Sequence, residues 1–327
     1  MTASGALQNK KCLVFGADGY IGRHLVHYLL QSGSTVAAFG LAPDAPCKEI
    51  NYRVVDIAER ASLEGLDWDV DAVFMFAGLT GTYDGFRRAE QFVKVNEIGV
   101  LNILELIRAS DFRPRLVFPS TRLVYRGSDA ALREDDPCEP KTIYAVNKLT
   151  CEHLLRVYSN SFDIDHTIYR ICVPYGNVIG SEYSYGTVGA FMKQAATNGV
   201  IRIYGDGSLR RTYTHVEDLC DQILHSCLAV STRNQTLNAF GEDVNLRTVA
   251  GAIAKKFGAM LEFTPFPDKD LRIESGHTVF DASRLLGLFE VRLKHKIAAW
   301  LEEIAPATTE SKRVVAREHG ASNHGVE

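Results

Sequence analysis

The stretch CLVFGADGYIGRHLVHYLL, residues 12–30, places three glycines between a short apolar run and a segment with helical spacing. Glycine lets a backbone turn sharply and pass close to a neighbouring group. The following segment aligns Ile21, Leu25 and Leu29 on one helix face, and the first turn of a helix leaves N–H groups unpaired. A strand, a glycine loop and a helix in this order predict a binding site for a phosphate group.

Outward from this loop, short β-branched or aromatic runs alternate with longer periodic segments, which is typical of βαβ units around a parallel sheet. We expect strands at 11–15, 35–39, 52–55, 72–76, 115–119 and 165–170, and long helices at 89–110 and 142–161. In the longer of the two periodic patterns, Phe92, Val95, Ile98, Leu101, Leu104 and Ile107 recur on one helix face.

In this setting Gly16 allows the turn, Gly19 the approach of a pyrophosphate, and Gly22 the close packing of helix on strand. The sequence therefore predicts an α/β fold, a Rossmann-type doubly wound parallel sheet that binds a dinucleotide. We assign this domain to residues 1–170, with return segments around 216–240. A smaller C-terminal substrate-binding lobe is expected at 171–304, and a disordered tail at 305–327.

Composition excludes several other classes. The net charge of −4 over 327 residues does not provide the positive electrostatic potential that attracts nucleic acid. No apolar run reaches the length of a membrane span and the N-terminus lacks a signal-peptide core, so we expect no membrane contact and a cytoplasmic location. Seven scattered cysteines without a CxxC pair argue against a disulfide framework and a zinc site, and we predict no metal.

Two positions, at the ends of the second and third strands, bear on the choice of cofactor. An acid at the end of the second strand usually binds the ribose 2′-hydroxyl of NAD, but Phe39 and Gly40 stand there. The missing acid removes a repulsion against a 2′-phosphate and favours NADP(H) over NAD(H). Asp56, after the third strand, either accepts a hydrogen bond from the adenine amine or caps a turn.

Tyr144 and Lys148 are four residues apart in the second long helix and project from one face. A neighbouring ammonium and a positive nicotinamide both favour the phenolate, so Tyr144 can move a proton while the cofactor moves a hydride. Lys148 would lower that pKa and hold the nicotinamide ribose, and Thr121 would hydrogen-bond the same substrate oxygen. The alternative is a half-buried helix aromatic beside a solvated lysine.

The segments VFGADGYIGRHLVHYLLQSG, VNEIGVLNILE, PSTRLVYRG, YAVNK, YGDGSLRRTYTHVEDL and FDASRLLGL occur in an order that resembles the extended short-chain dehydrogenase/reductase family, in its branch that acts on nucleotide sugars. The resemblance covers about residues 10 to 304. It implies a nucleotide-diphosphate sugar as substrate and a homodimer formed through the helices near 90–110 and 142–160.

The resemblance also implies roles for single residues. Thr121, Tyr144 and Lys148 fall on the family's catalytic set, Asn96 on its supporting asparagine, and Arg211 on an arginine that binds the nucleotide diphosphate. The full set of predicted cofactor-binding residues is Gly16, Gly19, Tyr20, Ile21, Gly22, Asp56, Ile57, Ala77, Asn96, Tyr144 and Lys148. The predicted substrate-binding residues are Thr80, Tyr83, Thr121, Asn177 and Arg211; for Thr80 and Tyr83, plain loop residues are the alternative.

Three departures from the family pattern matter. Sugar 4,6-dehydratases carry an acidic residue after the catalytic threonine, where this chain has Arg122, so dehydration is not expected. Val173 replaces an asparagine that holds the nucleotide sugar, so that contact is either absent or supplied by another residue, for which Asn177 is the candidate. Ala77, Gly78 and Leu79 stand where the family usually has LAA, and Thr80, Thr82 and Tyr83 follow where a sugar could meet hydroxyls.

His215, by contrast, matches a position that is structural in the family, and we expect a buried histidine there rather than an acid or base.

Three functions remain. A 4-ketoreductase would use NADPH to reduce a 4-keto-6-deoxy sugar nucleotide, with Tyr144 as proton donor. A 4-epimerase would use tightly held NAD to take hydride from C4 and return it to the other face. The third function is a non-catalytic redox sensor. The intact Thr121, Tyr144 and Lys148 argue against it, because a sensor needs no proton donor. The absent acid after the second strand favours the reductase.

Overall fold

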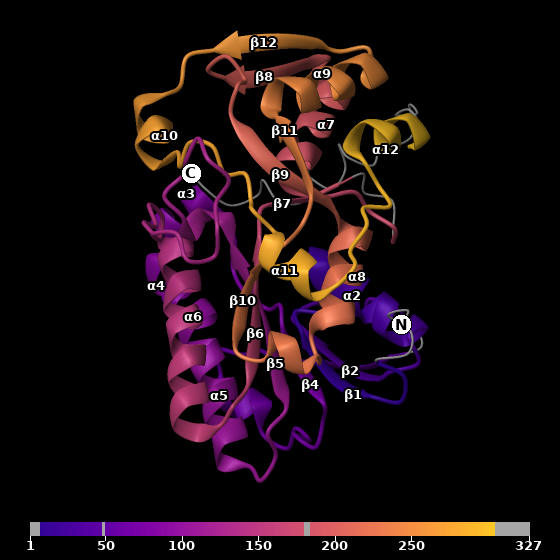
Figure 1. The fold of residues 1–327 in the computed structure, drawn as a ribbon, viewed down its shortest axis with the longest axis vertical. Coiled ribbons are helices and arrows are strands. Elements are labelled where there is room, and N and C mark those ends of the chain that lie inside the picture. The colour runs from indigo at the N-terminus through magenta and orange to yellow at the C-terminus, as the bar shows by residue number, and fades with distance from the viewer. Residues whose placement is uncertain (1–6, 48–49, 180–183, 305–327) are drawn as a thin grey trace.

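The computed structural model describes residues 7–47, 50–179 and 184–304. The tail at 305–327, for which disorder is expected, lies outside the described residues. The molecule has two lobes, of which the larger contains the main sheet and the smaller lies at one end of that sheet (Figure 1).

The main sheet is parallel throughout, and its strand order is β3-β2-β1-β4-β5-β6-β10. Its strands are β1 (Lys11–Phe15), β2 (Thr35–Gly40), β3 (Asn51–Val54), β4 (Ala72–Met75), β5 (Arg115–Thr121), β6 (His166–Ile171) and β10 (Gln235–Asn238). Central strands such as β5 are buried along their whole length because helices cover both faces. The Rossmann-type α/β fold predicted from the sequence is confirmed, and the order reverses between β1 and β4.

Two apolar layers sandwich this sheet. On one face α2 (Tyr20–Gln31), α8 (Val216–Ser226) and α11 (Ser283–Leu288) share a buried cluster with the strands. On the other face α5 (Gly99–Ala109), α6 (Ile143–Phe162) and the short η1 (Arg60–Leu63) do the same. The remaining short helices of the larger lobe are α3 (Thr82–Arg87), α4 (Ala89–Val93), η2 (Lys94–Ile98), η3 (Arg122–Val124) and η4 (Val230–Thr232).

The smaller lobe has its own apolar core, to which Phe191, Tyr213 and Trp300 contribute. It contains a three-stranded sheet in the order β11-β9-β7 and a parallel pair, β12-β8 (Figure 1). Its strands are β7 (Val173–Tyr175), β8 (Val200–Tyr204), β9 (Arg210–His215), β11 (Glu242–Asn245) and β12 (Met260–Thr264), and its helices are α7 (Gly186–Asn198), α9 (Leu246–Phe257), α10 (Asp268–Ile273) and α12 (Ile297–Glu303).

The segment expected to form one regular helix at 89–110 is interrupted by a π-helical turn, η2. The wider turn changes which residues face inward. Asn96 is 4% exposed, whereas Ile98, which the apolar pattern places in the core, is 42% exposed. The predicted apolar face is therefore wrong at Ile98, and a polar residue takes the inward position.

Several apolar side chains remain exposed on the helices expected to pair two chains. They include Val93 and Ile98 on the first segment and Val146 and Val157 on α6. Pairing through these helices stays a prediction. None of the helices in the described ranges has the length and apolarity needed to cross a membrane, and the compartment stays a prediction as well.

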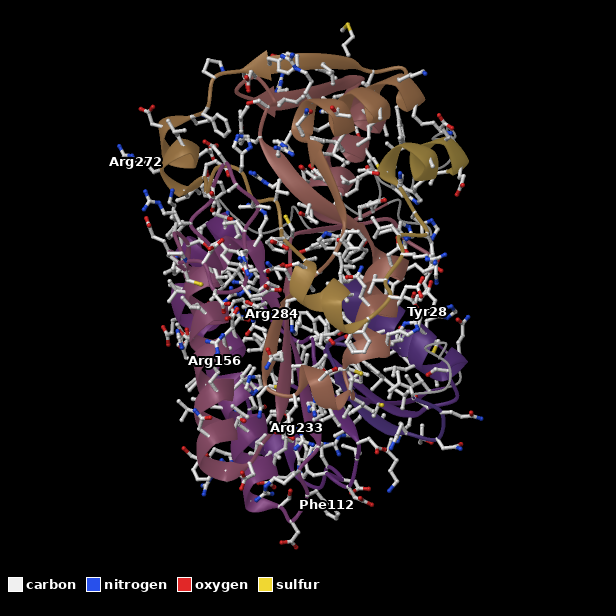
Figure 2. All side chains as sticks on the ribbon, viewed as in Figure 1. Tyr28, Phe112, Arg156, Arg233, Arg272 and Arg284 are labelled. Atoms are coloured by element: carbon white, nitrogen blue, oxygen red, sulfur yellow. The ribbon has the colours of Figure 1, made fainter. Side chains whose placement is uncertain are left out.

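A buried carboxylate joins α6 to the sheet. Glu152 is fully buried and accepts hydrogen bonds from Arg170 of β6 at 2.9 and 2.7 Å and from Ser120 of β5 at 2.5 Å. Arg156, one turn further along α6 (Figure 2), donates to Glu152 at 3.0 Å. Burial alone would raise the pKa of Glu152, but the Arg170 contacts outweigh it and hold the pKa below its ordinary value.

Removing this charge should destabilise the fold. We predict that Glu152→Gln lowers the free energy of unfolding by about 3 to 5 kcal/mol, because it leaves the buried Arg170 guanidinium without its counter-charge. Urea titration followed by circular dichroism measures the loss. Glu59→Gln, which removes one partner of the exposed pair with Lys94, is the matched control and should unfold like the wild type. Equal stability of the two variants would show that the buried bridge does not hold α6.

Candidate active site

The glycine loop is shaped by close backbone contacts at the end of β1. Gly16 has a φ of +79°, and a Cβ there would lie 2.4 Å from the backbone nitrogen of Ala77. A Cβ on Gly22 would lie 1.9 Å from the Gly16 carbonyl oxygen. These two predicted cofactor residues therefore let the loop, the end of β4 and α2 pack together.

The N-terminus of α2 opens onto a cavity of about 440 Å³. Gly19, Tyr20, Ile21 and Gly22 line it, and the Gly19 cap position has no side-chain hydrogen bond and no acid follows in the first turn. Free N–H groups and the positive end of the helix dipole suit a pyrophosphate. The residues present thus fit the dinucleotide that the loop sequence predicts.

A carboxylate lies at the end of β2 after all, and it comes from the glycine loop. Asp18 accepts hydrogen bonds from the backbone N–H groups of Leu41 and Ala42, both at 2.8 Å to one carboxylate oxygen. A Cβ on Gly40 would lie 2.4 Å from this carboxylate, so only glycine leaves it room. A carboxylate thus lies beside the end of β2 although β2 carries none itself, and sequence reasoning missed it.

The three predicted catalytic residues meet on the same cavity. Thr121 ends β5, while Tyr144 and Lys148 lie on the first turns of α6, where Thr142 caps the helix by accepting from Ala145 N–H at 3.2 Å. The four-residue spacing predicted that Tyr144 and Lys148 share one helix face. The position of α6 on the sheet brings Thr121 next to them. They form the wall that faces the glycine loop.

The electrostatics around Tyr144 differ from the expectation. Burial raises the pKa of its phenol, the neighbouring Tyr185 raises it further, and a hydrogen bond with Thr121 opposes them. The pKa stays well above its ordinary value although the Lys148 ammonium lies 5.9 Å from the Tyr144 ring centroid. At neutral pH the site therefore presents a neutral phenol, the form that donates a proton.

Lys148 is 6% exposed, and its ammonium lies 4.5 Å from the centroid of the Phe118 ring. Burial lowers the pKa of Lys148 to about 8. The ammonium therefore remains largely charged at neutral pH, and it carries three N–H donors that are suited to ribose hydroxyls.

Asn96 shapes the loop after β4. Its side-chain oxygen accepts from Leu79 N–H at 2.7 Å, and its amide donates to the Leu79 carbonyl at 3.0 Å and to Asn147 at 3.4 Å. The π-helical turn points Asn96 inward for this role, and π-helical turns often occur at functional sites. Gly78, beside it, lines the cavity.

Asp56 and Ile57 lie in the turn after β3. The Asp56 carboxylate accepts from Ala58 N–H at 2.9 Å, which is the turn-capping arrangement given above as the alternative. Ile57 is 5% exposed and packs against Gly99 of α5. Their contact with an adenine stays a prediction.

Of the two loop residues predicted to bind the substrate, Thr80 lines the cavity and Tyr83 does not. Thr80 lines the cavity, and its hydroxyl lies 2.8 Å from that of Tyr185. Tyr185, which was not among the predicted site residues, also lines the cavity and stacks on Tyr20 with ring centroids 5.0 Å apart. Tyr83 lies outside the cavity, 42% exposed, with the Lys269 ammonium 5.1 Å from its ring centroid.

Asn177 lies away from the catalytic wall. Its side-chain oxygen is 2.9 Å from His24 Nε2 of α2 and accepts from Ile179 N–H at 3.0 Å. Arg211 is 3% exposed and forms an ion pair with Glu274 at 2.7 Å. A diphosphate that binds Arg211 must therefore compete with the Glu274 carboxylate.

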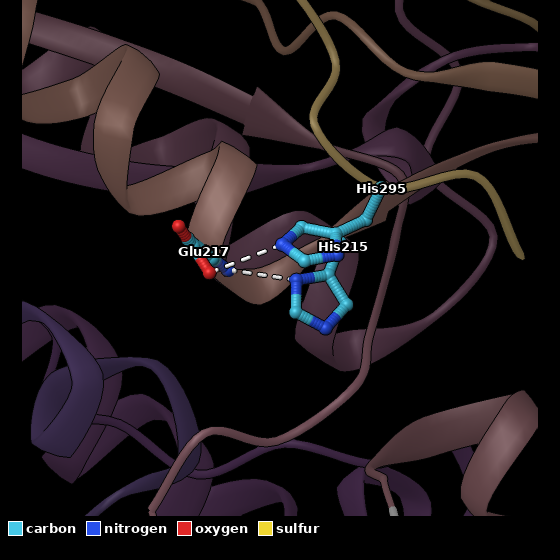
Figure 3. A group of neighbouring side chains, drawn as sticks. All are labelled: His215, Glu217 and His295. Atoms are coloured by element: carbon cyan, nitrogen blue, oxygen red, sulfur yellow. Dashed lines mark hydrogen bonds and ion pairs between the residues drawn. The ribbon is translucent and has the colours of Figure 1, made fainter. Parts of the chain in front are cut away.

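His215 caps the N-terminus of α8 and, with Glu217, contacts His295 of the C-terminal segment (Figure 3). Its Nδ1 accepts from Glu217 N–H at 3.3 Å, its ring lies 4.0 Å from that of His295, and His295 Nε2 is 3.0 Å from a Glu217 oxygen. Burial lowers the pKa of His215 to about 3, so the ring is neutral. One ring nitrogen from each of His215 and His295 and one Glu217 oxygen lie within 4.8 Å of one another, a spacing that could hold a metal ion. The Glu217 carboxylate also forms an ion pair with Lys294 at 3.3 Å, which would compete with a metal. The absence of a metal stays a prediction.

Comparison with known proteins agrees with this geometry. The model of the NAD dependent epimerase/dehydratase family matches residues 12–245. The chain is 28% identical to the low-salt glycan biosynthesis protein Agl12 of Haloferax volcanii over 64% of this chain and 70% of the relative. It is 27% identical to UDP-glucose 4-epimerase of Mycolicibacterium smegmatis over 80% of this chain and 88% of that one.

Solved structures share the fold. The epimerase Mth375 of Methanothermobacter thermautotrophicus superposes with a TM-score of 0.83 at 21% identity over 96% of both chains. Thermus thermophilus UDP-glucose 4-epimerase in complex with NAD gives 0.77 at 23% identity over 89% of this chain and 98% of that one. With the glycine loop, the Tyr144–Lys148 pair and the family match in agreement, the chain is an extended short-chain dehydrogenase/reductase and belongs to the NAD dependent epimerase/dehydratase family.

Proposed function

We propose that the protein is an NAD-dependent nucleotide-sugar 4-epimerase. The observation that carries the proposal is the cavity in which Thr121, Tyr144 and Lys148 face the N-terminus of α2. A bound nicotinamide supplies a reversible acceptor for a hydride. Everything else in the reaction is proton movement and positioning, which these side chains can perform.

Tyr144 exchanges a proton with the sugar oxygen that is oxidised and reduced. The forward half would require the phenolate of Tyr144, which the positive charges of the Lys148 ammonium and of a bound nicotinamide would favour over the neutral phenol of the empty site. Hydride would leave the carbon while the hydroxyl proton passes to that phenolate. In the return half the phenol would give the proton back as hydride returns to the opposite face of the carbon, so no cofactor would be consumed. Thr121 holds the same oxygen through its hydroxyl. The Lys148 ammonium orients the ribose and stabilises negative charge that develops on Tyr144.

The cofactor preference is the main reason to favour the epimerase. The expectation of NADP(H), and through it of a 4-ketoreductase, rested on a missing acid at the end of β2. The Asp18 carboxylate lies there, beside Gly40. A carboxylate accepts hydrogen bonds from ribose hydroxyls and repels a 2′-phosphate, which supports NAD.

Two observations bear on the substrate and on dehydration. Nucleotide-sugar 4-epimerases recur among the relatives, including UDP-glucuronate 4-epimerase of Thermodesulfobacterium geofontis at 23% identity over 80% of this chain and 85% of that one. Arg211, paired with Glu274, is kept as the proposed diphosphate contact. The cation at position 122 supplies no carboxylate for dehydration.

A panel of nucleotide sugars distinguishes the reactions. We expect an isomeric product of unchanged mass, formed with catalytic NAD and no net change in the absorbance band of the reduced nicotinamide. Mass spectrometry and NMR of the products, with absorbance followed in parallel, make the measurement. Stoichiometric loss of NADPH on a 4-keto-6-deoxy sugar nucleotide, with a product two mass units heavier, would instead establish the ketoreductase.

Replacing the proton-transfer group should separate catalysis from binding. Tyr144→Phe is expected to lower kcat by about 10²- to 10⁴-fold while the Kd of NAD changes little, since it removes a hydroxyl and little contact area. Stopped-flow kinetics and titration calorimetry measure the two quantities. Tyr204→Phe, an exposed tyrosine on β8, is the control. Near wild-type turnover of Tyr144→Phe would remove this residue from the mechanism.

Neutralising Asp18 should weaken the discrimination between cofactors. We expect the wild type to bind NAD about tenfold or more tighter than NADP, and Asp18→Asn to reduce that ratio by about tenfold as the repulsion of the 2′-phosphate disappears. Calorimetric Kd values for both dinucleotides test this without any turnover. Asp111→Asn, exposed after α5, should leave the ratio unchanged. A wild-type preference for NADP would restore the original expectation.

A further inference from the structure

The guanidinium of Arg122 has no carboxylate partner among the described residues. Arg122 begins η3 directly after Thr121, and its guanidinium donates a long hydrogen bond of 3.4 Å to the Thr278 hydroxyl. A guanidinium carries five N–H donors, so most of its bonding capacity is unused. Burial, and next the charge of Arg211, lower the pKa of Arg122 to about 10, which leaves it charged at neutral pH.

The surroundings of Arg122 hold a surplus of positive charge. Arg211 lies close enough to repel it, and the Glu274 carboxylate that serves this region is bonded to Arg211 at 2.7 Å. Beside them the Tyr213 hydroxyl is enclosed, in a residue 1% exposed, without a hydrogen-bond partner. One carboxylate thus faces two guanidinium groups and an unused O–H donor. An enclosed donor such as the Tyr213 hydroxyl is costly unless a ligand satisfies it, and the half-buried Arg122 guanidinium beside it keeps donors for the same ligand.

This cluster adjoins the catalytic wall. The residues on both sides of Arg122 in the chain, Thr121 and Leu123, line the cavity. So does Cys172, whose thiol lies close enough to Arg122 and Arg211 to be influenced by both charges. A sugar held by the Thr121 hydroxyl therefore brings its neighbouring substituents towards Arg122.

We infer that Arg122, with the Tyr213 hydroxyl, binds a carboxylate carried by the sugar ring, so that the substrate is a nucleotide hexuronate. The inference rests on the proposed function, which places C4 at Thr121 and Tyr144. In a hexopyranose, C5 and its exocyclic carbon are next to C4, whereas C1 and its diphosphate lie across the ring. A guanidinium fork matches the two oxygens of a carboxylate.

Binding measurements on the full chain saturated with NAD test the assignment. The probes are UDP-glucuronate and UDP-glucose, which differ only at C6, and the 1-phosphates of the same two sugars, which carry no base. We expect the wild type to bind each acid at least about tenfold tighter than its neutral counterpart. Arg122→Met should weaken only the acids, by about ten- to hundredfold, and Arg122→Lys should recover part of the loss.

The control is Arg126→Met, which removes an exposed cation of the next loop and should bind all four probes as the wild type does. The melting temperature and the Kd of NAD identify any variant that fails to fold, and Arg122→Lys then carries the comparison. Equal losses for acid and neutral sugars would assign Arg122 to the phosphates and overturn the inference, as would a wild type without preference for the acids. Calorimetry measures binding without turnover, so it tests the carboxylate site independently of the epimerase activity. A failure of the proposed epimerase function would appear only in the activity assay.

Discussion

The active site depends on one buried carboxylate, that of Glu152. The side chain leaves α6 one turn after Lys148 and is held by Arg170 of β6 and by Ser120, the residue that precedes Thr121 on β5. Tyr144 and Lys148 come from the helix and Thr121 from the sheet, so their mutual position depends on how α6 sits on β5. A fully buried ion pair with several hydrogen bonds has few alternative arrangements, which fixes that position more narrowly than apolar packing alone.

A second polar contact fixes the opposite rim of the cavity. Asn96 can bond both the N–H and the carbonyl of Leu79 because the π-helical turn faces it inward. Asn147, from the α6 turn that separates Tyr144 and Lys148, accepts from the same amide at 3.4 Å. The helix that bears the proton-transfer group and the loop where Thr80 meets the cavity are therefore linked through one side chain. An apolar residue at this position would pack but could not bond the loop.

The sequence predicted the sheet, the glycine loop and the shared face of Tyr144 and Lys148 because each is encoded locally, in apolar runs, in glycines and in a four-residue helical spacing. It mispredicted the inward face at Ile98, since a π-turn adds a residue that a regular period cannot register. It also missed Asp18 as the acid at β2, because that carboxylate reaches Gly40 from another part of the chain. Pairings such as Arg211 with Glu274 arise between residues distant in sequence, and no local pattern encodes them.

Asp18, Arg122 and Arg211 make the two ends of the site opposite in charge. Asp18, on the glycine loop, faces backbone N–H groups rather than a cation, and so remains an acceptor for hydroxyl groups. Arg122 and Arg211 lie beyond Thr121, where one carboxylate offsets two guanidinium groups. A ligand set with hydroxyls at one end and anions at the other is stabilised in one orientation and repelled in the reverse one.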